Sequence, residues 1–219
     1  MKKSTQPITY LGLIIAFFGV PFVVYLYSLF APEPYTDVFI LQKEIVIFAV
    51  MALLLWVVIK GEKKGLSSIG LHNKQWIRSI GRAIGLAIVL MAVLLLCVWI
   101  LGMFDIPVGG NEGKKYEAIS LWTMTLITIR AGVVEEICYR GYIIERLEKI
   151  SGGNMWIFLI VPVVVFALAH YSQGIAGLVI SFVAGLVLAF TYWKTRDLKA
   201  NILAHFLVDF VPNVVMQLL

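Results

Sequence analysis

Long apolar runs alternate with short polar connections along the chain. The apolar runs lie at about 8–30, 38–59, 80–104, 119–139, 155–170, 174–193 and 199–218. A helix of about 20 apolar residues crosses the hydrocarbon core of a bilayer. A helix also satisfies its own backbone hydrogen bonds, which lipid cannot do. The pattern therefore predicts an all-α fold, a polytopic transmembrane helical bundle of about seven spans.

Two of the predicted spans depart from a plain apolar helix. The fifth is short and contains Pro162, so we expect it to be broken or tilted. The fourth continues into an amphipathic stretch at 139–150.

Composition agrees with a membrane protein. Of the 219 residues, 61% are hydrophobic and only 14% are charged, which excludes an ordinary soluble composition. We find no soluble domain, low-complexity tract or convincing internal repeat, so residues 1–219 are expected to form a single integral membrane domain. Cys97 and Cys138 both lie in apolar runs, so we expect them to pack in the interior rather than form a disulfide or a redox pair.

The positive charges are strongly biased to one side of the predicted bundle. The net charge is +5, but the basic residues fall in short loops and at span ends, which indicates membrane topology rather than nucleic-acid binding. One side receives Lys2, Lys3, Lys60, Lys63, Lys64, Lys74, Arg78, Arg82, Arg140, Arg146, Lys149, Lys194, Arg196 and Lys199. The other side receives little besides Lys114 and Lys115. This asymmetry predicts a cytoplasmic N-terminus, and the short loops favour a prokaryotic plasma membrane.

Charged residues at membrane depth cluster in the fourth span. Glu135 and Glu136 are adjacent carboxylates, which repel each other in a low dielectric. Arg140 stands one helical turn after Glu136, so the two can pair and leave Glu135 on a different face. This spacing suggests Glu135 for chemistry and Glu136 with Arg140 for structure. Arg130 is expected to form a salt bridge or to snorkel, and Lys43 and Glu44 are expected to lie at the interface.

Two later spans carry histidines. Phe166 and His170 are four residues apart, as are His205 and Asp209, so each pair shares a helical face. A buried histidine alone most often makes a hydrogen bond between helices. Together with Glu135, however, the histidines can form a polar catalytic cavity among the C-terminal helices. Phe166 either packs in the core or shapes the pocket around His170.

Two kinds of chemistry fit these residues. A carboxylate and a histidine from different helices can activate a water for attack on a peptide carbonyl, and a second histidine can stabilise the oxyanion. Alternatively, Glu135, His170 and His205 can bind zinc, since two histidines and a carboxylate are a known zinc ligand set. The chain has neither a His-Glu-x-x-His helix nor a Gly-x-Ser-x-Gly elbow.

The three motifs together resemble those of a known family. Glu135-Glu136-x-x-x-Arg140, Phe166-x-x-x-His170 and His205-x-x-x-Asp209 occur in this order on separate apolar runs. In this respect the chain is similar to the CPBP family, which comprises CaaX prenyl endopeptidases and bacteriocin-processing or immunity-type (Abi) membrane proteases. The likeness covers about 119–213, the expected catalytic core, whereas 1–104 match only as generic membrane helices.

The resemblance implies a role for each motif residue. Glu135 and His170 would activate the water, His205 and Asp209 would stabilise the oxyanion, and Glu136, Arg140 and Phe166 would shape the site. The resemblance allows either a metalloprotease or a metal-independent glutamate peptidase. The second fits better, because Glu135, His170 and His205 lack an obvious hydrated fourth ligand, so we expect no cofactor, with zinc as the alternative. The prenyl endopeptidases have Asn where this chain has Asp209, so Asp209 must be protonated, bonded to His205 or another partner, or a metal ligand.

A joint catalytic role for His170 and Glu135 also requires that the two residues lie at a similar depth in the membrane. In straight helices His170 falls toward the outer end of its span, away from Glu135. A bend at Pro162, a deeper start of the fifth helix or a water-filled cavity would bring them together.

We therefore expect an intramembrane endopeptidase that cleaves a peptide or membrane-protein substrate at or just inside the cytoplasmic face. The alternative is a non-catalytic membrane scaffold or bacteriocin-immunity protein of the same fold. A proton-coupled transporter is less well supported, because it predicts symmetry between the two halves of the chain, and we find none in the sequence. The expected surroundings are the lipid bilayer and a polypeptide substrate, with no nucleic acid.

Overall fold

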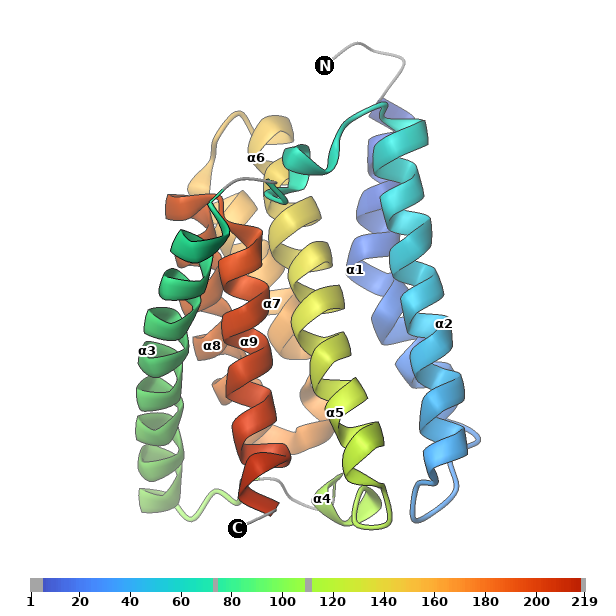
Figure 1. Cartoon of the computed structure of the whole chain (residues 1–219), viewed down its shortest axis with the longest axis vertical. Coiled ribbons are helices and arrows are strands. Elements are labelled where there is room, and N and C mark those ends of the chain that lie inside the picture. Colours follow the sequence, from blue (N-terminus) through green and yellow to red (C-terminus); the bar gives the residue numbers. More distant parts are fainter. Residues whose placement is uncertain (1–5, 73–74, 109–111, 218–219) are drawn as a thin grey trace.

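The computed structural model describes residues 6–72, 75–108 and 112–217, which form helices and connecting loops without a strand (Figure 1). The α-helices are α1 (Gln6–Ser28), α2 (Asp37–Trp56), α3 (Trp76–Met103), α4 (Glu112–Lys115), α5 (Leu121–Arg130), α6 (Glu145–Ile150), α7 (Val161–Leu168), α8 (Gly174–Thr195) and α9 (Leu198–Asn213). Wider, π-type turns form η2 (Val57–Gly61), η4 (Ala131–Ile144) and η5 (Trp156–Ile160), and short 3₁₀ turns form η3 (Leu66–Ile69), η6 (Tyr171–Gln173) and η7 (Val215–Gln217). The all-α prediction is confirmed.

Four helices in the described ranges are long and apolar enough to cross a membrane. They are Pro7–Ser28, Asp37–Gly61, Trp76–Met103 and Tyr171–Thr195. This agrees with an integral membrane protein. The other three predicted spans are also helical: Trp156–Leu168 is apolar but shorter, and the helices that carry Glu135 and His205 contain the charged motif residues.

The helices of the fourth and fifth predicted spans are both continuous through the segments that were expected to be irregular. The helix that begins at Leu121 runs without interruption through α5, η4 and α6 to Ile150. Pro162 does not break the fifth helix, because it occupies the first turn of α7, where the missing N–H costs little, directly after the wide turn η5.

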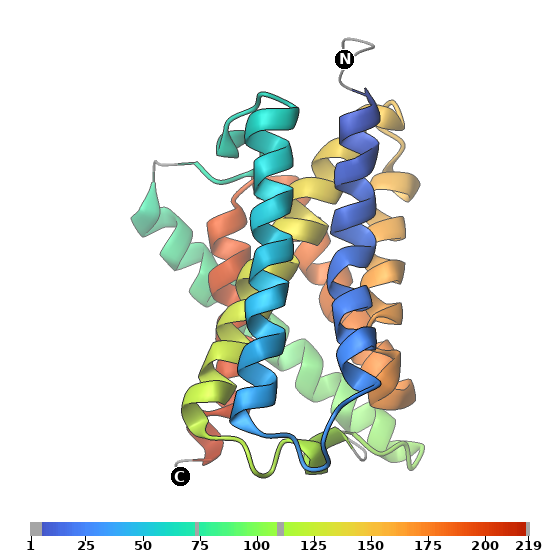
Figure 2. The same cartoon turned by 90° about the vertical axis from the view of Figure 1, so that its right-hand side faces the viewer.

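The segment η4 lies at the centre of the bundle. It packs against α1, α2, α7, α8 and α9 (Figures 1 and 2), and all of its residues except Val133 are buried. Wide helical turns of this kind occur frequently at functional sites. The sequence Ala131–Ile144 therefore places both glutamates of the first motif in the interior of the protein.

A glycine lets α9 approach η4 closely. A Cβ on Gly132 would lie 2.9 Å from the backbone oxygen of Ile202 and 3.0 Å from the backbone nitrogen of Phe206. Both neighbours are backbone atoms, so they have no rotamer with which to move away. The absence of a Cβ at position 132 thus allows the close approach of the helices that carry Glu135 and His205.

Gly132→Ala is therefore expected to destabilise the protein by about 1–3 kcal/mol, which is typical of overpacking. Thermal unfolding in detergent measures the effect. Gly81→Ala is the matched control, because a Cβ at Gly81 in α3 meets nothing within 4 Å, and alanine should slightly stabilise that helix. Equal melting temperatures for the two variants would contradict the close approach.

A buried ion pair joins three helices at the end of the bundle where the N-terminus lies. Arg146 Nη2 donates to Glu62 Oε2 at 2.6 Å, and the Tyr142 hydroxyl donates to Glu62 Oε1 at 3.0 Å. Thr9 of α1 also donates to Glu62. Burial opposes ionisation of Glu62, but the hydrogen bond and charge of Arg146 hold its pKa below the ordinary value. This end of the helix that carries Glu135 and Glu136 is thus fixed to α1 and to the segment after α2.

Candidate active site

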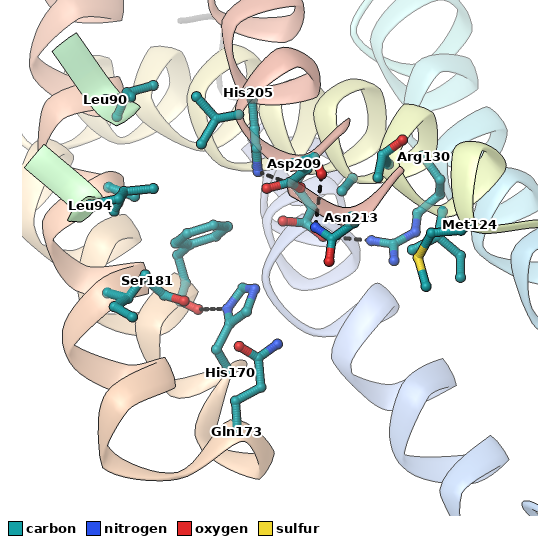
Figure 3. A pocket seen from close by; sticks show the side chains of 18 of the residues that line it. Leu90, Leu94, Met124, Arg130, His170, Gln173, Ser181, His205, Asp209 and Asn213 are labelled. Carbon is teal, nitrogen blue, oxygen red and sulfur yellow. Dashed lines mark hydrogen bonds and ion pairs between the residues drawn. The ribbon is translucent and has the colours of Figure 1, made fainter. Parts of the chain in front are cut away.

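A cavity of about 730 Å³ brings together residues of all three motifs (Figure 3). Glu135 reaches it from η4, Phe166 and His170 from α7 and the turn after it, and His205 and Asp209 from α9. Arg130, at the end of α5, also lines it. Glu136 and Arg140 are almost fully buried behind the wall of the cavity.

The two carboxylate oxygens of Glu135 differ in their hydrogen bonding. Oε1 accepts a hydrogen bond from Arg130 Nη1 at 2.5 Å, whereas Oε2 has no hydrogen bond among the described residues. The residue is only 9% exposed, and that exposure is toward the cavity. One oxygen is therefore held by a charge-assisted hydrogen bond, and the other is available to a water in the cavity.

Arg130 is shared between two carboxylates. Its Nε donates to Glu44 Oε2 at 2.8 Å, while Nη1 serves Glu135. Lys43 Nζ lies 3.3 Å from Glu44 Oε1. The prediction of a salt bridge for Arg130 is confirmed. Lys43 and Glu44, which were expected to lie at the membrane interface, are buried inside the protein, Glu44 completely.

The physical reason is charge balance. A guanidinium turned toward the protein interior requires buried counter-charges, and α2 supplies one from outside the three motifs. The sequence did contain a usable signal: Glu44 is an acid inside an apolar run, and Arg130 was the intramembrane cation without an assigned partner.

Glu44→Ala is expected to lower kcat by about ten-fold or more with little change in KM, because without Glu44 the guanidinium is free to engage both oxygens of Glu135. Glu44→Gln keeps an acceptor for the Nε–H group and should retain most of the activity. In an Arg130→Gln background, Glu44→Ala should cause no further loss. Peptide-cleavage kinetics on the folded fraction of each of the four variants measure these effects. If Glu44→Ala lowered kcat as much in the Arg130→Gln background as in the wild type, Glu44 would not act through Arg130.

Glu136 is fully buried, and both of its carboxylate oxygens accept hydrogen bonds. Oε1 accepts from Arg140 Nη1 at 2.7 Å and from His205 Nδ1 at 2.9 Å, and Oε2 accepts from Asn201 Nδ2 at 3.1 Å. Its oxygens are thus occupied by protein donors, unlike Oε2 of Glu135. Asn201 is not among the residues predicted from the sequence, although it lies one helical turn before His205, at the same spacing as the motif pairs.

His170 lies in the turn after α7, and its ring is oriented by a backbone carbonyl. Nδ1 is 2.8 Å from the carbonyl oxygen of Phe166. Because a carbonyl only accepts, Nδ1 carries the proton and the neutral ring has its lone pair on Nε2. The cavity extends to this depth and is lined by both His170 and Glu135. Both residues therefore face a common cavity, although Pro162 does not break the fifth helix.

Phe166 packs between the motif residues. Its ring centroid is 4.7 Å from that of His170, 6.3 Å from that of His205 and 4.5 Å from the guanidinium carbon of Arg140. It is 3% exposed and lines the cavity. The ring therefore combines core packing with a position between the two histidines.

Asp209 faces His205 from one turn later on α9. Its Oδ2 lies 3.5 Å from His205 Nε2, while Nδ1 of the same ring donates to Glu136. Of the alternatives that the sequence left open for Asp209, the geometry corresponds to a contact with His205. His205 is thus placed between two carboxylates, and its Nε2 side faces the cavity.

The described residues do not fit the zinc alternative. Among them, no three His, Cys, Asp or Glu side chains converge as a metal-binding group. His205 has one ring nitrogen engaged by Glu136 and the other next to Asp209, and Glu135 is bound to Arg130. The set Glu135, His170 and His205 therefore lacks the arrangement of a His₂-carboxylate site.

Comparison with known protein families identifies the region that contains the motifs. The model of the Rce1-like type II CAAX prenyl endopeptidase family matches residues 117–211, which contain all three motifs. No curated protein and no solved structure matches the chain. The resemblance to the CPBP family is confirmed: residues 117–211 are an Rce1-like type II CAAX prenyl endopeptidase (CPBP) family domain.

Proposed function

We propose that this protein is an intramembrane endopeptidase of the CAAX-protease type in which Glu135 and His170 activate a water. The family domain implies a membrane protease. The observation that carries the mechanism is the pair of free acceptors at the cavity: Oε2 of Glu135, which has no hydrogen bond within the described chain, and Nε2 of His170, whose ring is oriented by Phe166.

In the proposed reaction, a water held between these acceptors attacks the scissile carbonyl carbon, and its proton passes to Glu135. The carbonyl oxygen becomes an oxyanion that accepts a hydrogen bond from His205 Nε2. This role requires a proton on Nε2 as well as on Nδ1, that is, an imidazolium between Glu136 and Asp209. The C–N bond then breaks, and Glu135 returns the proton to the leaving amine.

The cavity also offers a surface for the substrate. Opposite the polar residues, its wall is formed by apolar side chains of α3 and α8, among them Leu90, Leu94, Ile180 and Leu188. These side chains can hold an apolar part of a peptide or membrane-protein substrate by removing it from water. We place the protein in a prokaryotic plasma membrane with a cytoplasmic N-terminus, on the basis of the four long apolar helices and the charge asymmetry.

The experiment is cleavage of a panel of quenched peptides by the purified protein in detergent, with and without a chelator. His170→Ala is expected to lose about 10²-fold or more in kcat/KM. Tyr171→Ala, at an exposed neighbour outside the cavity lining, is the matched control. Chelation should leave the rate unchanged.

Equal cleavage by wild type and His170→Ala would contradict the site, and loss on chelation would contradict the metal-independent mechanism. Peptide binding without any cleavage by the wild type would instead favour the non-catalytic scaffold.

A further inference from the structure

The exposed part of the cavity lining identifies its mouth. Three of the lining residues are exposed, namely Glu117 before α5, Gln173 in η6 and Asn213 at the end of α9. The lining residues farthest from this rim, such as Leu90 and Leu188, are buried. The cavity therefore opens at the end of the bundle where α5 and α8 begin and α9 ends.

This is the end opposite the N-terminus. Figure 1 shows the N-terminus and α6 at one end of the bundle and α4 and the C-terminus at the other, and Figure 2 shows the same separation of the termini. The mouth thus lies on the side of α4 and the C-terminus. The cavity is lined by the middle parts of the helices and by the parts that lie nearer to this side.

The two ends of the bundle differ sharply in charge. Exposed Lys63, Lys149 and Lys194 lie at the α6 end. Arg146 and Arg196 lie there as well, but their charges are paired with Glu62, Glu145 and Glu148. Acidic residues predominate at the mouth end, with Glu33, Asp37, Asp105 and Glu117 against Lys114 and Lys115. Cytoplasmic loops carry the excess of Lys and Arg, so the mouth lies on the extracytoplasmic side.

We infer that the substrate is a polypeptide segment that reaches Glu135 and His170 from the extracytoplasmic side of the membrane. This revises the expectation of cleavage at the cytoplasmic face, which assumed that the site lay near the basic ends of the motif helices. That the segment is cleaved there rests on the proposed function. The sidedness of the cavity rests on the geometry and the charge distribution alone.

Single cysteines test the sidedness in intact cells. In a Cys97→Ala/Cys138→Ala background, Gln173→Cys and Asn213→Cys report on the mouth, and Lys149→Cys and Lys194→Cys report on the basic end. A membrane-impermeant maleimide should label the mouth positions in intact cells and the basic positions only after permeabilisation. Labelling of the basic positions in intact cells, or equal labelling of both ends, would overturn the inference.

A second readout tests whether the mouth is the path of the substrate. Each variant is purified after labelling, and its peptide cleavage is compared with that of the same variant before labelling. A bulky maleimide at Gln173→Cys should lower cleavage by about ten-fold or more, because it blocks access to the cavity, whereas the label at Lys149→Cys should not. Undiminished cleavage by labelled Gln173→Cys would overturn this path. If the wild type cleaves no peptide, the proposed function fails, while the labelling pattern still decides the sidedness.

Discussion

Glu135→Gln is expected to lower kcat by about 10³-fold while KM stays within about two-fold, since a general base contributes about 10² to 10⁴ to a rate. Glutamine keeps the size of the side chain and an oxygen that can accept the Arg130 hydrogen bond. It cannot take a proton from water. The variant therefore removes the chemistry and keeps the shape of the cavity.

Steady-state cleavage of a quenched peptide measures this effect in detergent or in liposomes. Glu33→Gln is the control, because Glu33 lies in the loop before α2 with a side chain that is 74% exposed. It should keep the wild-type rate. A Glu135→Gln enzyme with a wild-type kcat would remove Glu135 from the mechanism, whereas a raised KM at constant kcat would indicate a role in substrate binding alone.

Arg140→Met is expected to cost about 3–5 kcal/mol of folding stability, because it leaves Glu136 as a buried charge without its cation. Side-chain exposure at this pair is 2% for Arg140 and 0% for Glu136. Only the donors from Asn201 and His205 would remain. In a chain of this length the loss corresponds to a fall in melting temperature of about 10 °C.

Lys149→Met is a closely matched control for the ion pair. Glu145 and Lys149 have the same four-residue spacing on the same continuous helix, but their atoms are 3.8 Å apart and the Lys149 side chain is 47% exposed. A surface pair of this kind contributes about 0–1 kcal/mol. Adding Glu136→Gln to Arg140→Met removes the unpaired charge and should restore part of the melting temperature. Equal melting temperatures for Arg140→Met and Lys149→Met would contradict the buried-charge account.

The helices and the motif residues could be predicted because their signals are local. Apolar runs indicate spans wherever they occur, and a four-residue spacing indicates a shared helical face, as the Glu136–Arg140 pair illustrates. The order of the three motifs also led to the correct family. None of these signals requires knowledge of which helices are neighbours.

The missing parts of the site depend on contacts between helices. Glu44 reaches Arg130 from a helix 86 residues earlier in the chain, and the amide of Asn201 reaches Glu136 across 65 residues. Neither contact can be predicted from the spacing of neighbouring residues in the sequence. The position of the cavity mouth was missed for a related reason: the motif residues gave the depth of the site within each helix, but the open end depends on which loops surround it.

The most direct test of the central claim is a double-mutant cycle between Glu135 and His170. Single-turnover cleavage is measured for wild type, Glu135→Gln, His170→Ala and the double variant. If the two side chains activate one water, the double variant should be no slower than the slower single variant. Losses that multiply in the double variant would show that the two residues act independently, and this would contradict the shared water.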